Sequence, residues 1–206
     1  GEAELACPAV RARAAVLPGT LAKLRALHRL HAEGAKGPSF EQAALVMMLR
    51  YQSLGGGGFQ LALPPSAFQV LERRFGVCAE CFASPLNCWF GHFCSAFPDC
   101  DAPFGSLGSF LSFRPKRGAF EANPPFSPAI LAAARAHMQA LLDEATGPLS
   151  FVVAVANWDH EEVRALSASP YARARAVVPA EEQCWQDGAS SRRASVELLL
   201  LVLQNA

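Results

Sequence analysis

SPAILAAARAHMQALLDEATGPLSFVVAV, residues 127–155, is the segment that decides the fold class. Ser127 and Pro128 are typical of a helix start, because serine caps the first turn and proline fits its first position. A glycine and a proline at 147–148 then end the helix, and the apolar, β-branched run at 149–155 is typical of a strand buried in a parallel sheet. The expected helix has one apolar face, formed by Leu131, Ala134, Met138, Leu141 and Leu142.

A strand is also expected just before this helix, at GAFEA (118–122). Strand, loop, helix and strand in this order make a βαβ unit with parallel strands. The other expected elements, in chain order, are a short helix at 65–75, a strand that runs into a turn at 76–87, a helix over LNCWFGHFCSAF (86–97), a loop at 98–109, a strand FLSF (110–113) that pairs with GAFEA around RPKR, and strands in RAVVPA (175–180) and SVELLLLVLQN (195–205). The pattern predicts an α/β fold with a doubly wound, mostly parallel sheet.

The N-terminal part has a different pattern. Leucines recur every third position over 19–33, and Ser39 can cap a second helix, so two helices are expected. GGGG at 55–58 is typical of a flexible connector. We therefore expect a helical extension at 1–54 and a core domain at 55–206.

Composition and charge limit the function. The chain has 206 residues, about half of them hydrophobic, and a formal net charge of zero, which argues against binding a polyanion through bulk charge. The apolar run LLLLVL (198–203) is far shorter than the ~20 residues of a membrane span and predicts a buried strand. The N-terminus has no signal-peptide pattern and begins with Gly1, so the chain is expected to be intracellular and part of a longer protein.

Seven cysteines include the pair Cys78–Cys81, but a second C-x-x-C and a paired histidine motif are missing. We therefore expect reduced, mostly buried thiols and no metal site.

The row NPPF (123–126) lies where the strand at 118–122 passes into the helix, at the edge where open α/β sheets bind ligands. The Asn123 side-chain oxygen and the Pro124 carbonyl are two acceptors on a stiff backbone. Together they would accept both hydrogens of an exocyclic amino group and leave its nitrogen lone pair available, while the Phe126 ring stacks on the base. The alternative is a proline-rich loop that only ends a strand.

The row resembles the [D/N]-P-P-[F/Y/W] motif of amino-methyltransferases that use S-adenosylmethionine. More narrowly, six blocks in the same order resemble the phosphorylated C-terminal-domain interacting factor family: ECFASPLN, CSAFPD, FGSLG, FEANPPF, PLSFVV and LQN. The resemblance, from about residue 40 onward, implies a Rossmann-like class I methyltransferase core. It also implies methylation of N6 of 2′-O-methyladenosine next to the mRNA cap, with S-adenosylmethionine as donor. The implied location is the nucleus and the implied partners are capped mRNA and, through regions outside this chain, the RNA polymerase II tail.

The same resemblance implies roles for individual residues. The catalytic motif would be Asn123, Pro124, Pro125 and Phe126. The cofactor site would contain Glu80, Ser84, Pro85 and Asn87, together with Asp99, Asp101, Phe104, Gly105 and Ser106. The alternative for the second of these groups is an ordinary turn with side-chain hydrogen bonds. Trp158 would stack on the substrate with Phe126, or else serve as a packing residue.

Two other functions stay open. The motif also fits N-methylation of another planar amine or amide, such as DNA adenine or protein glutamine. An inactive binding module on a methyltransferase scaffold is the second, although a scaffold does not require the intact order of Asn123 to Phe126.

Overall fold

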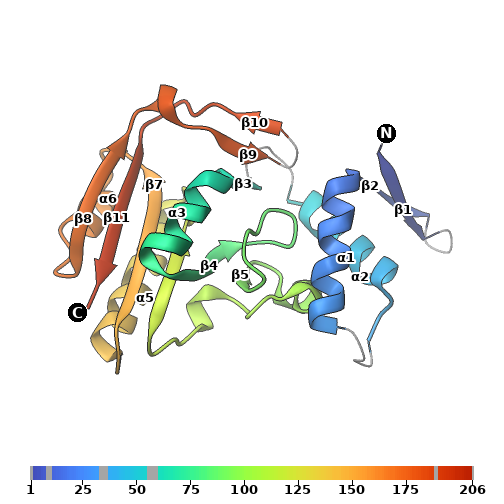
Figure 1. Ribbon diagram of the computed structural model, residues 1–206, viewed down its shortest axis with the longest axis horizontal. Helices are drawn as coiled ribbons and strands as arrows, with labels where there is room; N and C mark the ends of the chain where they lie inside the picture. The colour runs from blue at the N-terminus through green and yellow to red at the C-terminus, as the bar shows by residue number, and fades with distance from the viewer. Residues whose placement is uncertain (1, 8–10, 33–36, 55–59, 188–189, 206) are drawn as a thin grey trace.

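A sheet of six strands forms the centre of the larger part of the protein (Figure 1). The computed structural model describes residues 2–7, 11–32, 37–54, 60–187 and 190–205. Neighbouring strands of the sheet are, in order, β5 (Phe93–Ser95), β4 (Val77–Ala83), β6 (Gly118–Ala122), β7 (Leu149–Ala156), β11 (Leu198–Gln204) and β8 (Ala172–Val178). β5, β4, β6 and β7 pair in parallel, and β11 is antiparallel to both β7 and β8. The predicted α/β class with a mostly parallel sheet is confirmed.

Helices cover both faces of this sheet. α5 (Pro128–Glu144) and α6 (Glu161–Ser167) lie on one face and α3 (Pro65–Phe75) lies on the other (Figure 1). Alternate side chains of β7 enter the two interfaces. Phe151 and Val153 pack with α5 and α6, whereas Val152 and Ala154 belong to the cluster that contains Phe68 of α3. Helices on both faces are what the doubly wound prediction required.

The extension at the N-terminus contains both predicted helices, α1 (Pro18–Ala32) and α2 (Phe40–Gln52). Ser39 caps α2 as expected, and its side chain and that of Gln42 form a reciprocal capping box. The hairpin of β1 (Ala3–Cys7) and β2 (Ala12–Val16) was not predicted. The glycine run at 55–58 lies outside the described residues, so the division into 1–54 and 55–206 stays a prediction.

The extension packs beside the β5 edge of the sheet (Figure 1). Leu24 of α1 and Met47 of α2 share a hydrophobic cluster with Phe93 and Phe104, and all four side chains are fully buried. The remaining elements are β3 (Leu61–Ala62), α4 (Pro98–Asp101), β9 (Trp185–Asp187), β10 (Ser190–Arg192) and 3-10 turns at Ala102–Phe104, Phe110–Ser112 and Ala180–Glu182. β10, β9 and β3 form a separate small sheet in that order.

The helix predicted over 86–97 is wrong. This segment is a loop that leads into β5. The backbone N–H groups of Trp89 and Phe90 donate to the Glu80 carboxylate at 2.8 and 3.0 Å rather than to helix carbonyls. Phe93 then pairs with β4, so burial in the sheet outweighs the apolar pattern that suggested a helix.

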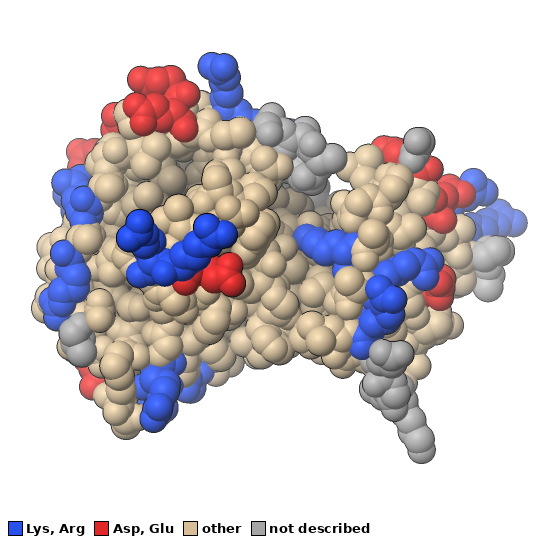
Figure 2. All heavy atoms as spheres, in the orientation of Figure 1, with Lys and Arg blue, Asp and Glu red and all other residues tan. Residues whose placement is uncertain are grey.

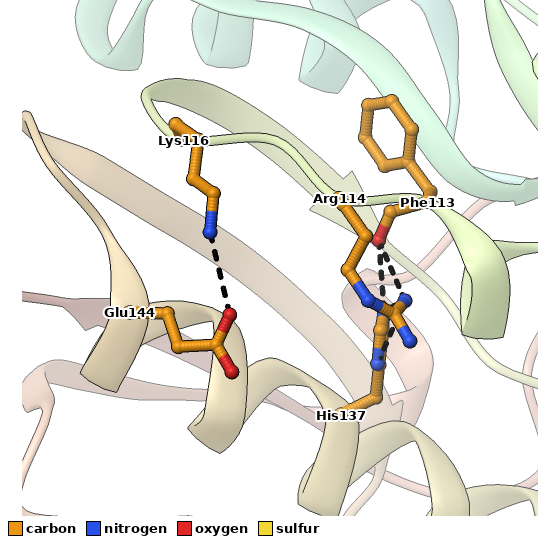
Figure 3. Close-up of polar contacts among 5 residues, drawn as sticks. All are labelled: Phe113, Arg114, Lys116, His137 and Glu144. Carbon is orange, nitrogen blue, oxygen red and sulfur yellow. Dashed lines mark hydrogen bonds and ion pairs between the residues drawn. The ribbon is translucent and has the colours of Figure 1, made fainter.

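The hairpin predicted between FLSF (110–113) and GAFEA (118–122) is also wrong. Residues Phe110–Ser112 form a 3-10 turn, and β6 already has a parallel neighbour on each side. The intervening RPKR segment is attached to α5 instead (Figure 3). The His137 ring contacts the Phe113 carbonyl at 3.0 Å and Arg114 at 3.1 Å, and Lys116 pairs with Glu144 at 3.3 Å. These contacts connect the segment before β6 to α5, and the Lys116–Glu144 pair is exposed and contributes little to stability.

Charged side chains are dispersed on the face seen in Figure 2, where Lys and Arg form separate groups and Asp and Glu lie beside some of them. This agrees with the zero net charge. In the part of the chain that the structure describes, no helix is long and apolar enough to cross a bilayer.

Candidate functional site

The strand order reverses between β4 and β6. β5 follows β4 in the chain and lies on its outer side, whereas β6 and β7 extend the sheet the other way. Ligands of open α/β sheets bind beyond the carboxyl ends of the strands at such a switch point. Asn123 directly follows β6, and the turn Ser84–Asn87 directly follows β4. The structure therefore brings the first predicted cofactor segment and the NPPF row to the same edge of the sheet.

A small cavity lies at this switch point. Its volume is about 10 Å³, roughly the space of one water molecule. It is lined by Leu61, Ala62, Leu63, Phe68, Glu80, Phe82, Asn87, Glu121 and Asn123. Ligand sites usually have volumes of roughly 300–1,000 Å³. The cavity is far smaller than that and can receive only a group about the size of a water molecule, such as an ammonium. The rest of any ligand would have to lie outside it.

The acceptors of the NPPF row are free. Asn123 is half-buried, and neither its side chain nor the Pro124 carbonyl has a hydrogen-bond partner among the described residues. The next carbonyl, that of Pro125, is engaged by the Ser127 N–H at 2.7 Å. Both groups thus lack a donor among the described residues, and Pro124 is itself buried whereas Asn123 is half-buried.

Two aromatic rings lie beside the row. Phe126 and Trp158, which follows β7, are 38% and 40% exposed. Their ring centroids are 5.4 Å apart and the ring planes are inclined by 70°. The structure thus brings together the two residues predicted to stack on a substrate, and both keep open ring surface.

The turn after β4 is held by its own side chains. The Ser84 N–H donates to Asn87 Oδ1 at 2.8 Å, and the Ser84 hydroxyl accepts from the Leu86 N–H at 3.1 Å. The Ser84 hydroxyl also donates to Gln60 Oε1. Ser84 and Pro85 are buried, so they shape the turn, whereas Asn87 reaches the cavity.

Lys23 of α1 holds this turn from the extension. Its ammonium group donates to the Leu86 carbonyl at 2.8 Å and to the Cys88 carbonyl at 3.2 Å. The charge of Lys23 also acts on Glu80, whose pKa it lowers in part. The first helix is therefore part of the support of the site.

Two glutamates lie side by side at the floor of the cavity. Glu80 and Glu121 are direct partners in the β4–β6 register and are 3% and 2% exposed. Burial raises the pKa of Glu80 to about 7. The hydrogen bonds from the N–H groups of Trp89 and Phe90 act in the opposite direction but are outweighed by burial. Burial and the neighbouring Glu80 charge raise the pKa of Glu121 well above its ordinary value.

The second predicted cofactor group does not line this cavity. Asp101 is fully buried and accepts a 2.7 Å hydrogen bond from Tyr51 of α2, and burial raises the pKa of Asp101 to about 6. Asp99 pairs with Arg50 at 3.2 Å on the surface. Both acidic residues thus attach α2 to the segment after β5, and their role toward a cofactor stays a prediction.

The remaining three residues of that group lie close to α1 and β5. Phe104 is fully buried beside His28, and the Ser106 hydroxyl lies 2.7 Å from that of Ser95. Gly105 has a φ of +103°, and a Cβ there would lie 2.3 Å from a backbone carbonyl oxygen. Only glycine fits this position.

The cysteines are free thiols, and four of the seven are buried. Burial raises the pKa of Cys81, Cys88, Cys94 and Cys100, so these thiols stay protonated. In the described part of the chain, no group of three or more His, Cys, Asp or Glu side chains is arranged to hold a metal ion.

Sequence reasoning missed Glu121 and Lys23. The signal for Glu121 was present, because a lone carboxylate inside the apolar strand GAFEA must be buried when both neighbouring strands pair with it. Lys23 gave no such signal. It lies among other basic residues of an amphipathic helix, and its contacts are 63 and 65 residues away in the chain.

The sequence pattern of a known family, described as the phosphorylated CTD interacting factor 1 WW domain, matches residues 23–188. A mouse protein named mRNA (2′-O-methyladenosine-N(6)-)-methyltransferase is 43% identical over 151 residues. A human protein of the same name is 42% identical over 151 residues. Each alignment covers 69% of this chain and 21% of the relative, so the chain spans about a fifth of the length of these proteins.

Proposed function

Because this chain belongs to the family described as the phosphorylated CTD interacting factor 1 WW domain, we propose that it carries the methyl-transfer site of an RNA adenosine-N6 methyltransferase. The proposed donor is S-adenosylmethionine and the proposed acceptor is 2′-O-methyladenosine next to the mRNA 5′ cap. The names of the mouse and human relatives support this acceptor. The observation that carries the proposal is the pair of unused acceptors at Asn123 and Pro124, beside two exposed rings at a switch point.

The reacting amine would be oriented by this row. The Asn123 side-chain oxygen and the Pro124 carbonyl accept the two hydrogens of N6, which keeps the nitrogen lone pair out of the ring system. Phe126 and Trp158 stack on the adenine, an interaction worth ~1–3 kcal/mol per base. Methylation of a neutral amine yields a cation that loses a proton readily, so orientation and hydrogen bonding suffice.

The residues of the cavity fit the proposed donor. Its lining offers two carboxylates and two amides, and the Glu121 carboxylate has no hydrogen-bond partner among the described residues. Such a set suits a cationic, hydrogen-bond-donating ligand. When bound, S-adenosylmethionine supplies an electrophilic methyl group on a sulfonium ion. Glu80, Asn87 and Glu121 would hold one end of the donor, and Asn123 would face its reactive end.

The order and direction of the strands support the same function. Four parallel strands followed by a reversed strand, β11, between β7 and β8 agree with a Rossmann-like class I methyltransferase core. We further propose, from the family resemblance, a nuclear location and binding to capped mRNA.

The test is a methylation assay with three acceptors: capped RNA that begins with 2′-O-methyladenosine, the same RNA without a cap, and DNA. Mass spectrometry identifies the product nucleoside. N6-methylation of the capped RNA is expected. Methylation of DNA alone would instead favour the alternative function, N-methylation of DNA adenine. Asn123→Ala should lower kcat roughly 10²–10³-fold, the range for loss of one oriented polar group, with unchanged donor affinity by calorimetry. A folded Asn123→Ala variant with near-normal turnover would contradict the role of the amide.

A further inference from the structure

The two glutamates at the cavity floor face the same side of the sheet. Direct partners on neighbouring parallel strands project in the same direction, and Glu80 and Glu121 are such partners. Both side chains are almost fully buried, and both line the cavity with Asn123. Two carboxyl groups are thus placed next to each other in a space screened from bulk water.

Their hydrogen bonding is incomplete. Glu80 Oε1 accepts from the N–H groups of Trp89 and Phe90, whereas Glu121 has no partner among the described residues. The described ion pairs include neither glutamate. The other titratable groups that act on the pair are Lys23, whose ammonium is bonded to two carbonyls, and the thiols of Cys81 and Cys88. β7 on the far side of β6 contributes only Val152 at the level of Glu121.

Two carboxylates this close cannot both ionise without a counter-charge. The raised pKa values of both groups, caused first by burial, mean that the ligand-free pair holds a proton near neutral pH. An acceptor-rich cavity with a retained proton is completed by a ligand that brings positive charge and hydrogen-bond donors.

We propose that Glu80 and Glu121 form one proton-sharing cation site, and that the ammonium group of the methyl donor enters it with release of a proton. This inference rests on the proposed function. The balance is simple: one carboxylic acid loses its proton to solvent, and the resulting carboxylate pairs with the entering ammonium, which keeps all its protons. Donor affinity should therefore rise with pH, up to roughly tenfold per pH unit below the pKa of Glu80 near 7.

Calorimetry of donor binding in two buffers of different ionisation enthalpy counts the released protons. S-adenosylmethionine and S-adenosylhomocysteine both carry the ammonium group, and 5′-methylthioadenosine lacks it. We expect about one proton released with the first two ligands and none with the third. This comparison separates the ammonium from the sulfonium, which S-adenosylhomocysteine lacks.

Variants test the two residues. Glu121→Gln should abolish most of the proton release and flatten the pH dependence of donor affinity. Glu80→Gln, which keeps an acceptor for Trp89 and Phe90, should do the same and guards against misfolding of the first variant. Glu144→Gln changes an exposed carboxylate and should bind like the unmodified protein.

If the unmodified protein binds S-adenosylmethionine with a measurable heat but releases no proton, this inference is wrong and the proposed function is unaffected. Equal proton release with 5′-methylthioadenosine would also overturn it. Absence of heat with all three ligands would overturn both the inference and the proposed donor.

Discussion

The buried glutamate pair makes the ligand-free protein less stable as the pH rises from about 5 to about 8. The folded state holds the proton of Glu80 up to about pH 7, whereas the unfolded chain releases it near 4.5. Between these values the folded state binds more protons, so the free energy of unfolding falls as pH rises. The stabilising effect is complete below the unfolded pKa and is lost as pH passes through the folded pKa.

The size follows from the pKa difference. A shift from 4.5 to about 7, at about 1.4 kcal/mol per pKa unit, corresponds to about 3 kcal/mol of unfolding free energy. Glu121 acts in the same direction, because its pKa is also raised. Most domains have only ~5–15 kcal/mol in total, so the loss is large enough to measure.

Urea unfolding at about pH 5 and about pH 8, without donor, measures this effect from the linear dependence of the unfolding free energy on denaturant. Glu80→Gln removes the titrating proton but keeps an acceptor for the two N–H groups. We expect the unmodified protein to lose about 2–3 kcal/mol more than this variant between the two pH values, slightly less than the full shift because pH 5 lies above the unfolded pKa. Glu144→Gln is the control and should follow the unmodified protein. Equal losses in the unmodified protein and in Glu80→Gln would refute the reasoning.

Two further predictions concern the attachment of the extension. Tyr51→Phe should lower the unfolding free energy by about 1.5–3 kcal/mol, the range for a hydrogen bond to a charged group, because it removes the 2.7 Å hydroxyl donor from a fully buried carboxylate. Tyr171→Phe removes a similar bond on the surface and should cost less, so an equal shift in Tm would contradict the role of Tyr51. Gly105→Ala should lower Tm more than Gly108→Ala, since both have positive φ but only Gly105 lacks space for a Cβ. Equal Tm values would show that the backbone at the Gly91 carbonyl moves aside at little cost, and would contradict this prediction.

Local signals explain which elements were predictable. The segment 127–155 has a cap position, a periodic face and a β-branched run, and it forms α5 and β7. The Ser127 side chain makes no capping bond, so the predicted cap is wrong in this detail. The proline after it and the apolar face are the parts of the helix prediction that are confirmed. β5 could not be read from its neighbours, because the N–H groups before it are taken by Glu80, a partner nine or ten residues earlier. The wrong hairpin at 110–122 had the same origin, since β6 finds its partners in β4 and β7.

The site residues also divide into those with a local sequence signal and those that depend on distant partners. Asn123, Pro124 and Phe126 could be predicted from a short, stiff motif, and Trp158 from its place in the loop after β7. The glutamate partner of Glu80 and the lysine that supports the turn became visible only when separate segments met in space. Residues that act on a ligand within one segment are accessible to sequence reasoning, whereas charge pairs built across strands are not.

The reversed strand has a consequence for biosynthesis. β8 is an edge strand whose sheet neighbour is β11, and β11 begins about 20 residues after β8 ends. While the ribosome makes the intervening residues, which takes roughly 1–4 s at ~5–20 residues per second, β8 has nothing to join. One edge of β7 therefore stays unpaired in the nascent sheet until β11 is made and inserts between β7 and β8.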